Sequence, residues 1–292
     1  MPLTQGARYM LLSTLFFALM NVCVKLLAHL PALEIILFRS VISIIISYST
    51  LRLLHIRPWG SNHFFLIARG TTGALALILY FFTLQQMPLA TAVTIQYLAP
   101  IFTTVLGIFI VKEKVKAWQW AFFLLSFVGV LVVEGVDTRV DPLYLALGVV
   151  SAVFSGFSYN SIRRLKGREH PLVVVFYFPM VALPIAAIYC LFHWVMPQGL
   201  DWLWLGLTGV FTQGAQVCMT KAYQAEKLSS VANLNYVGIL YALGLGFVLF
   251  GEAFRPEVYL GMSLVLVGVV LNTWYVRRHR SVPEAPVAEP IV

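Results

Sequence analysis

The amino-acid sequence predicts an all-α membrane protein of ten transmembrane helices, arranged as two inverted five-helix repeats with both termini in the cytoplasm. Three observations support this fold: the composition, ten long apolar stretches, and a match between the two halves. Hydrophobic residues make up 60% of the chain and charged residues 11%, with a mean hydropathy of +0.86. Soluble domains carry about 25% charged residues. The composition therefore excludes a water-soluble core.

Each apolar stretch is long enough to cross a bilayer, because about 20 apolar residues span the hydrocarbon layer as a helix. We place the spans at 9–27, 33–53, 64–85, 91–111 and 118–136, and then at 143–162, 172–194, 202–223, 231–250 and 258–276. The first stretch lacks a small-residue cleavage site and carries Asn21 and Lys25, so it is interpreted as a span and not as a signal peptide. The repeats are residues 1–136 and 143–276, and the polar tail at 277–292 is expected to be disordered in the cytoplasm.

The distribution of basic residues sets the expected orientation. With the N-terminus inside, most Lys and Arg collect on the cytoplasmic face, while the opposite face receives Lys25, Arg139 and Arg255. This is the positive-inside bias of membrane proteins. The net charge of +8 is therefore explained by topology, and no nucleic-acid partner is expected.

The two halves match at an offset of 139 positions. Identical residues pair along the alignment: Gln85 with Gln224, Leu89 with Leu228, Tyr97 with Tyr236, Gly107 with Gly246, Glu113 with Glu252, and Gly129 with Gly268. An odd number of spans per repeat inserts the second copy upside down, and inverted repeats of this kind are typical of secondary transporters.

Polar residues recur at helical spacing on several spans, which indicates a shared cavity. The candidate substrate-binding residues are Asn21, Tyr80, Thr94, Gln96, Tyr97, Ser155, Ser158, Tyr159, Gln213, Gln216, Asn233 and Tyr236. The alternative is that these groups bond only between helices, as is common in membranes. Pro100, deep within the fourth span, is a gating candidate because proline tends to kink a helix.

Three cations are candidates for a substrate carboxylate: Lys25, Arg39 and Lys221. Arg39 lies about five residues inside the second span, and an intramembrane charge is a functional hypothesis by default. The alternative is that such side chains extend to the headgroups. Arg69, like Arg39 and Lys221, is expected near a membrane face. No Asp or Glu falls near the middle of a span, so movement down the solute's gradient, or exchange, is expected in place of simple proton antiport.

No catalytic or cofactor motif is present in the sequence. The six histidines form no metal-ligand spacing, and the chain has no HExxH, GxSxG or P-loop. We therefore expect no enzyme activity, no cofactor and no metal. The expected partners are a small-molecule substrate and the lipid bilayer, with a monomeric chain.

Several segments together resemble the drug/metabolite transporter superfamily, and within it the EamA-type permeases. They are the string from Glu34 to Arg39, the stretch from Leu89 to Pro100, Glu113 after the fourth span and Glu252 after the ninth. The resemblance implies a basket-like ten-helix fold in the inner membrane, with a cavity lined mainly by helices one, three, four, six, eight and nine. Small relatives in the superfamily carry a functional Glu in their first helix, where this chain offers Asn21.

The resemblance implies an exporter of amino acids and related metabolites that works by alternating access. The aromatic and amide residues are similar to the branch that exports neutral and aromatic amino acids, which we favour. A nucleotide-sugar or nucleoside/drug transporter of the same superfamily remains the alternative. A sugar nucleotide carries two phosphates and requires several cations at mid-depth, whereas Arg39, Arg69 and Lys221 are expected near the faces.

Overall fold

The computed structural model describes residues 3–86, 95–134, 142–250 and 256–278, and these residues form an all-helical protein. The first half contains α1 (Gln5–Leu26), α2 (Ala32–Leu53), α3 (His63–Gln86), α5 (Ala99–Ile110) and α6 (Ala117–Glu134). The second half contains α7 (Pro142–Arg164), α8 (Pro171–Cys190), α9 (Asp201–Ala225), α10 (Leu228–Val231), the 3₁₀ turn η1 (Ala232–Tyr236), α11 (Val237–Phe250) and α12 (Pro256–Arg278). The predicted all-α class is confirmed.

Six of the described helices are long and apolar enough to cross a membrane on their own: α1, α2, α3, α7, α8 and α12. The apolar helices α5 and α6 are shorter within the described residues. The predicted spans agree with most observed helices to within a few residues at each end. Three spans differ: α8 ends at Cys190 and not at residue 194, α5 begins at Ala99 and not at residue 91, and α11 begins at Val237, after the 3₁₀ turn η1, and not at residue 231. Thr94 lies outside the described residues. Of the predicted polar tail at 277–292, the structure describes residues 277 and 278.

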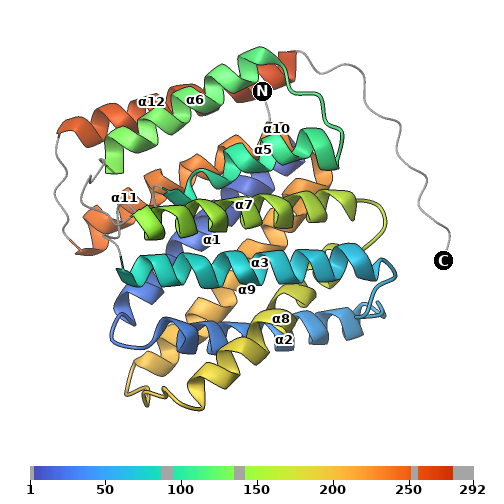
Figure 1. Ribbon diagram of the computed structural model, residues 1–292, viewed down its shortest axis with the longest axis vertical. Coiled ribbons are helices and arrows are strands. Elements are labelled where there is room, and N and C mark those ends of the chain that lie inside the picture. Colours follow the sequence, from blue (N-terminus) through green and yellow to red (C-terminus); the bar gives the residue numbers. More distant parts are fainter. Residues whose placement is uncertain (1–2, 87–94, 135–141, 251–255, 279–292) are drawn as a thin grey trace.

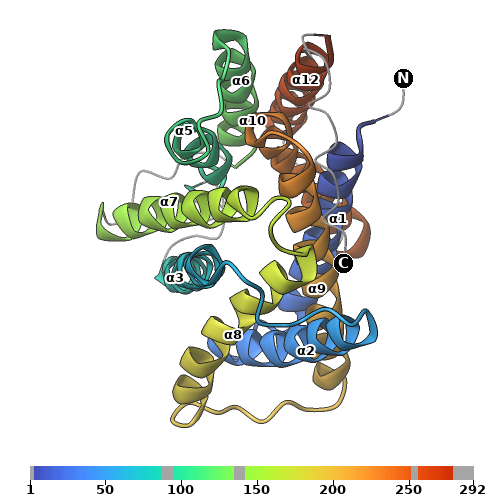
Figure 2. The same cartoon turned by 90° about the vertical axis from the view of Figure 1, so that its right-hand side faces the viewer.

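The helices stack in layers (Figures 1 and 2). α6 and α12 pack together as an outer layer, and α2 packs with α8 on the opposite side. Between them, α1 packs along α9 and α3 packs along α7, while α5 lies against α7 and α11 against α1. Each of these pairs joins one helix from the first half to one from the second, so neither half packs as a separate bundle.

Glycines allow the close approach of α6 and α12. A Cβ on Gly129 would lie 2.7 Å from the backbone oxygen of Gly261 and the backbone nitrogen of Val265. A Cβ on Gly268 would lie 2.9 Å from the backbone oxygen of Phe122 and the backbone nitrogen of Ser126. Gly129, late in α6, lies against Gly261 early in α12, whereas Phe122, earlier in α6, lies against Gly268 later in α12. The two helices therefore run antiparallel.

Pro100 does not kink the middle of a helix, contrary to the sequence-based expectation. It is the second residue of α5, which begins at Ala99, and the chain just before it turns at Tyr97 and Leu98. Proline fits the first turn of a helix because the N–H that it lacks has no intrahelical acceptor there. The proline therefore marks the start of α5, directly after an interruption of the fourth span.

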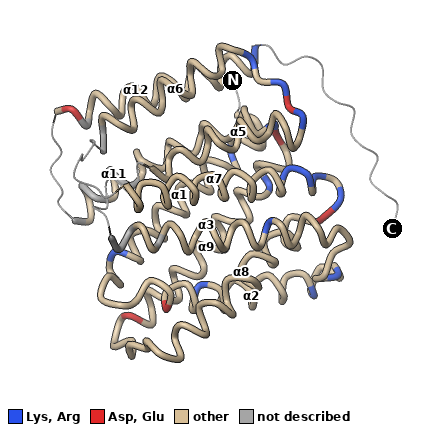
Figure 3. The backbone as a smooth tube through the Cα atoms, in the orientation of Figure 1, with Lys and Arg blue, Asp and Glu red and all other residues tan. Residues whose placement is uncertain are grey.

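Lys and Arg gather at one end of the helices, where the α5–α6 and α7–α8 connections lie (Figure 3). These connections contain Lys112, Lys114, Lys116, Lys166 and Arg168. The segregation of basic residues supports the expected cytoplasmic placement of this end.

Candidate functional site

Two helices are interrupted at matching positions, and the interruptions meet. The turn at Tyr97 and Leu98 precedes α5, and η1 ends at Tyr236 directly before α11. Tyr97 and Tyr236, which correspond at the 139-residue offset, pack with ring centroids 6.0 Å apart. We call them the tyrosine pair. Interrupted helices are where many transporters place their binding groups, because the break exposes backbone polar groups.

Arg69 of α3 is the most deeply buried cation that the structure describes, at 2% exposure. Its Nη1 donates to Ser158 Oγ of α7 at 2.6 Å, and its Nη2 donates to Gln216 Oε1 of α9 at 2.9 Å. Its Nε is buried without an acceptor. Four helices contribute to this site, because the guanidinium carbon also lies 5.1 Å from the ring centroid of Phe178 on α8.

Arg39 of α2 lies against the same ring. Its guanidinium carbon is 5.6 Å from the Phe178 centroid, and the residue is 5% exposed. Among the described residues, no acid forms an ion pair with either arginine. Glu34, five positions before Arg39, instead accepts a hydrogen bond from the backbone N–H of Val195 at 3.1 Å. We call Arg39, Arg69, Ser158, Phe178 and Gln216 the arginine cluster.

The arginine cluster is energetically unbalanced. Burying an ion costs several kcal/mol. Hydrogen bonds to a charged group contribute about 1.5–3 kcal/mol each, and a desolvated cation–π contact about 2 kcal/mol. Arg69 has two such hydrogen bonds and one ring contact, whereas Arg39 has the ring contact alone. Arg39 therefore has fewer stabilising contacts than Arg69 among the described residues, and an intramembrane charge of this kind is a functional hypothesis by default.

A chain of aromatic residues connects the arginine cluster to the tyrosine pair. Tyr159 directly follows Ser158, the hydrogen-bond partner of Arg69, and stacks on Tyr223 with ring centroids 5.1 Å apart. The hydroxyl of Tyr223 accepts a hydrogen bond from Asn235 Nδ2 at 3.0 Å, and Asn235 directly precedes Tyr236 in η1. Polar and aromatic groups therefore run without a break from α2 to the interrupted helices.

Glycine provides the space for Arg69, and this is the signal that sequence reasoning missed. A Cβ on Gly73, one turn after Arg69, would lie 2.8 Å from Phe178 Cδ2 and 3.0 Å from Ser158 Oγ, and still closer to Arg69 Nη1. Arg69 was expected near a membrane face and is instead enclosed by side chains. A glycine one turn after an arginine, on the same helical face, leaves room for the arginine side chain to lie along its own helix. Gly73 therefore indicates this conformation for Arg69.

The structure brings many of the predicted site residues together. Ser158, Tyr159 and Gln216 surround Arg69, as described above. Gln96 bridges two serines of α7: its Nε2 donates to Ser155 Oγ at 3.1 Å, and its Oε1 accepts from Ser151 Oγ at 3.2 Å. These bonds link the interrupted fourth span to α7.

Other predicted residues bond between helices, away from the arginine cluster. Gln213 bonds with Ser43 and Ser47 of α2, and Asn233 Nδ2 donates to the backbone oxygen of Gly268 at 3.4 Å. Asn21 is exposed on α1, and Tyr80 is half-buried on α3. Thr94 lies outside the described residues.

The remaining cation candidates lie at helix ends. Lys25 is exposed in the last turn of α1. The Lys221 ammonium nitrogen lies 5.3 Å from the ring centroid of Tyr9. Neither belongs to the arginine cluster, so Arg39 is the one predicted charge candidate that contributes to it.

An ion pair closes the basic end of the molecule. Glu113, just after α5, accepts from Arg163 Nε of α7 at 3.1 Å and from the backbone N–H of Leu228 at 2.9 Å. Arg163 also donates to the backbone oxygen of Gln224 at 3.0 Å. Burial raises the pKa of Glu113, and Arg163 acts in the opposite direction. One carboxylate thus joins α5, α7, α9 and α10.

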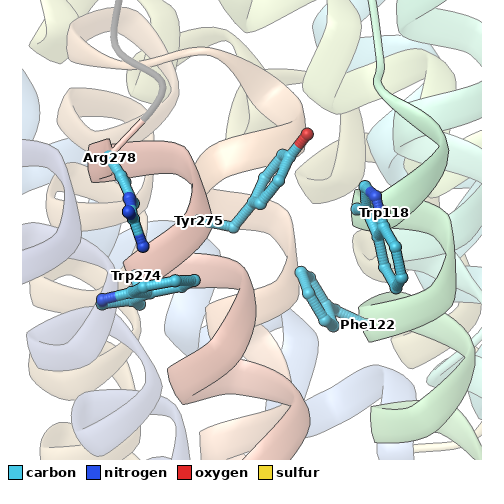
Figure 4. A pocket seen from close by; sticks show the side chains of 5 residues that line it. All are labelled: Trp118, Phe122, Trp274, Tyr275 and Arg278. Carbon is cyan, nitrogen blue, oxygen red and sulfur yellow. The ribbon is translucent and has the colours of Figure 1, made fainter.

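A separate pocket of about 500 Å³ lies between α6 and α12 (Figure 4). Trp118 and Phe122 of α6 face Trp274, Tyr275 and Arg278 of α12 across it. None of these residues belongs to the arginine cluster or the tyrosine pair. We therefore assign the candidate solute site to the buried cluster and not to this peripheral pocket.

The fold and the site define a multi-pass membrane protein whose interior holds buried charges beside interrupted helices. A comparison with protein families is in agreement: the model of the EamA-like transporter family matches residues 4–134 and again 142–274. The chain belongs to this family, which lies in the drug/metabolite transporter superfamily. It is thus a membrane transporter, and family membership is consistent with the absence of enzyme activity.

Several relatives carry transporter names, and two of them name a cargo. The chain is 30% identical to the pseudopaline exporter CntI of Pseudomonas aeruginosa (strain UCBPP-PA14), over 92% of this chain and 95% of that protein. It is 28% identical to human solute carrier family 35 member G1, over 92% and 80%, and 26% identical to the riboflavin transporter of Vibrio cholerae, over 94% and 95%. One solved crystal structure matches 96% of this chain and all of its own chain, with a TM-score of 0.84 at 16% identity, and this likeness concerns the fold alone.

Proposed function

We propose that the chain is an inner-membrane secondary transporter that exports small carboxylate-bearing metabolites by alternating access, down their gradient or by exchange. The observation that carries this proposal is the buried guanidinium of Arg69: it donates to Ser158 and Gln216, and among the described residues it has no acid partner and no acceptor for its Nε. A guanidinium is well matched to a carboxylate because it can donate two parallel hydrogen bonds. Neutral and aromatic amino acids, which the sequence favours, are the first solutes to test.

Alternating access is supported by contacts that recur between the halves. Ser13 Oγ donates to the backbone oxygen of Ala215 at 2.8 Å, and Ser151 Oγ donates to that of Ala76 at 2.7 Å. Ser151 stands 138 positions after Ser13, and Ala215 stands 139 after Ala76. The same contact is therefore made twice, with the roles of the halves exchanged.

Two glycine contacts follow the same rule. The Cβ position of Gly70 meets Val181, and that of Gly209 meets Ile42. Gly209 and Val181 follow Gly70 and Ile42 by 139 positions. Together with the antiparallel crossing of α6 and α12, these pairs support two inverted repeats, residues 1–136 and 143–276, related by a pseudo-two-fold axis. Two such repeats can rock against each other around a fixed central site.

The Glu113–Arg163 ion pair is suited to act as a gate that opens during the transport cycle. It joins α5 of the first repeat to α7 and α10 of the second. Rocking of one repeat against the other must therefore break this pair. Its position at the basic end of the molecule predicts that it controls access from the cytoplasm.

Counterflow in liposomes tests the proposed function. Purified protein is reconstituted with a high internal concentration of one unlabelled solute, and uptake of the same labelled solute is followed for phenylalanine, alanine, succinate and uridine diphosphate glucose. We expect transient accumulation of at least one carboxylate-bearing solute, and none in protein-free liposomes. Absence of accumulation for every carboxylate solute would contradict the proposal.

A nucleotide-sugar or nucleoside/drug transporter is the second candidate function. Two buried cations beside an aromatic path, Arg39 and Arg69, are the observation in its favour. Uridine diphosphate glucose in the counterflow panel tests it directly. Accumulation of this solute alone would select this alternative.

A further inference from the structure

We propose that Arg39 and Arg69 together bind a solute with two separate carboxylates, in preference to a zwitterionic amino acid. This inference rests on the proposed transport function and narrows its substrate class. It comes from one arrangement: the guanidiniums of Arg39 and Arg69, on different helices, contact the same ring of Phe178. Among the described residues, no acid forms an ion pair with either arginine.

The shared ring sets an upper limit on the separation of the two charges. The guanidinium carbons lie 5.6 Å and 5.1 Å from one centroid, so they are no farther apart than the sum of these distances. A short carbon chain with a carboxylate at each end spans such a gap. Each carboxylate would then meet its own guanidinium.

The donors needed for two carboxylates are available. Arg69 Nε is buried and has no acceptor. Arg39 has no hydrogen-bond acceptor among the residues that the structure describes, although it is only 5% exposed. Buried guanidinium groups without acceptors are rare, because an N–H donor that finds no acceptor has lost its hydrogen bond to water without replacement. Carboxylate oxygens of a bound solute would satisfy them.

The same charges disfavour a zwitterion. An amino acid brings an ammonium group with its carboxylate, and that group needs an acid or another acceptor. The described polar neighbours of Arg69 are the neutral side chains Ser158, Tyr159 and Gln216, and Gln216 Oε1 already accepts from Arg69. An ammonium placed here is repelled by two guanidiniums in a medium of low dielectric constant.

A single phosphate is a second source of double negative charge, but it fits less well. Its charge is concentrated on one centre, whereas Arg39 and Arg69 come from different helices and each contacts the ring of Phe178. Inorganic phosphate therefore serves as the competing arm of the test.

Equilibrium binding to the purified, detergent-solubilised full chain tests the proposal, with titration calorimetry of succinate, glutarate, phenylalanine and inorganic phosphate. We expect a dicarboxylate to bind at least about 10-fold more tightly than phenylalanine or phosphate. Arg39→Gln and Arg69→Gln should each weaken dicarboxylate binding by about 30-fold or more, because each leaves one carboxylate unpaired.

Arg52→Gln is the matched control. Arg52 lies on α2 like Arg39, and its guanidinium carbon is 5.4 Å from the ring centroid of Tyr48, but it is exposed at the helix end. This variant should bind dicarboxylate like the wild type. Arg39→Lys and Arg69→Lys, which keep the charge but lose the planar fork, should show intermediate affinity. Competition between glutarate and phenylalanine on the wild-type protein requires no variant to fold.

The outcomes separate this inference from the proposed function. Phenylalanine or phosphate binding as tightly as glutarate, no dicarboxylate binding, or an Arg39→Gln variant with wild-type affinity would each overturn the dicarboxylate site. Counterflow of phenylalanine without dicarboxylate binding would keep the transporter and reject this site. Dicarboxylate binding without counterflow would keep the site and reject transport.

Discussion

The outer pair α6 and α12 and the arginine cluster differ in how they relate the two halves of the chain. In the outer pair, Gly129 contacts Val265 and Gly268 contacts Ser126, which is one contact made twice at an offset of 139. In the arginine cluster, the counterpart of Arg39 at this offset is Phe178, and that of Arg69 is Thr208. The packing recurs, whereas the charge does not.

This difference assigns separate tasks to the two regions. Contacts between backbones and small side chains depend on shape alone, so both halves can make them with the same residues. A solute site must bind a molecule that has no two-fold symmetry, and its chemistry is free to differ between the halves. Arg39 and Phe178 occupy matching positions and contact each other, as Tyr97 and Tyr236 do. In the proposed inverted-repeat arrangement, contacts between such matching positions would lie on the pseudo-two-fold axis.

The largest expected effect comes from breaking the recurring packing. Gly268→Leu places a side chain against the Phe122 and Ser126 backbone, and overpacking typically costs about 1–3 kcal/mol. We expect a marked fall in the thermal unfolding midpoint, and a similar fall for Gly129→Leu. Gly206→Leu is the control, because nothing lies within 4 Å of its Cβ position. If Gly129→Leu lowered the unfolding midpoint and Gly268→Leu did not, the symmetry of the packing would be contradicted.

The second prediction disturbs the charge without removing it. Gly73→Ala brings a methyl group into the space of the Arg69 guanidinium, so the hydrogen bonds to Ser158 and Gln216 must lengthen or break. Loss of one charge-assisted bond, about 1.5–3 kcal/mol, corresponds to about 10- to 100-fold weaker solute binding. Calorimetry of the best-bound solute measures it. Wild-type affinity would show that the position of Arg69 is not important for binding.

The third prediction concerns the closure at Glu113. Because burial raises its pKa in the folded state, the folded protein holds this proton more tightly than the unfolded chain. The stability associated with this group is therefore full at low pH and is lost as pH rises through the raised pKa, above the ordinary value of 4.5. The thermal midpoint of the wild type should fall relative to that of Glu113→Gln over this range. A wild-type midpoint that rises relative to that of Glu113→Gln as pH increases would contradict this assignment.

The smallest effect is expected at Gln213. Its bonds to Ser43 and Ser47 join α9 to α2, and interhelical hydrogen bonds in membranes contribute about 1–2 kcal/mol or less. Gln213→Leu should therefore lower the thermal midpoint slightly and leave solute binding unchanged. A large loss of solute affinity in this variant would instead return Gln213 to the solute site, as the sequence suggested.

The sequence predicted the helices well because long apolar stretches have few alternatives in a bilayer. It also identified Tyr97 and Tyr236 as corresponding residues, since identical residues at a constant offset mark matching positions, but it did not predict that their rings contact each other. The start of α5 was harder to predict, because Pro100 suits the first turn of a helix as well as a kink. Arg69 was misplaced because position along a span does not report which neighbours enclose a side chain. Only the packing of α3 against α7 and α8, together with the hydrogen bond to Gln216 of α9, does so.

The central claim is that two matching halves expose one charged centre alternately to the two sides of the membrane. Labelling from each side tests this claim most directly. Ser155→Cys, introduced after Cys23, Cys190 and Cys218 have been replaced by alanine, places a single thiol beside Gln96. In sealed vesicles of known orientation, this thiol should react with a membrane-impermeant reagent from either side, and saturating solute should change both rates. Reaction from one side only, with or without solute, would contradict the account.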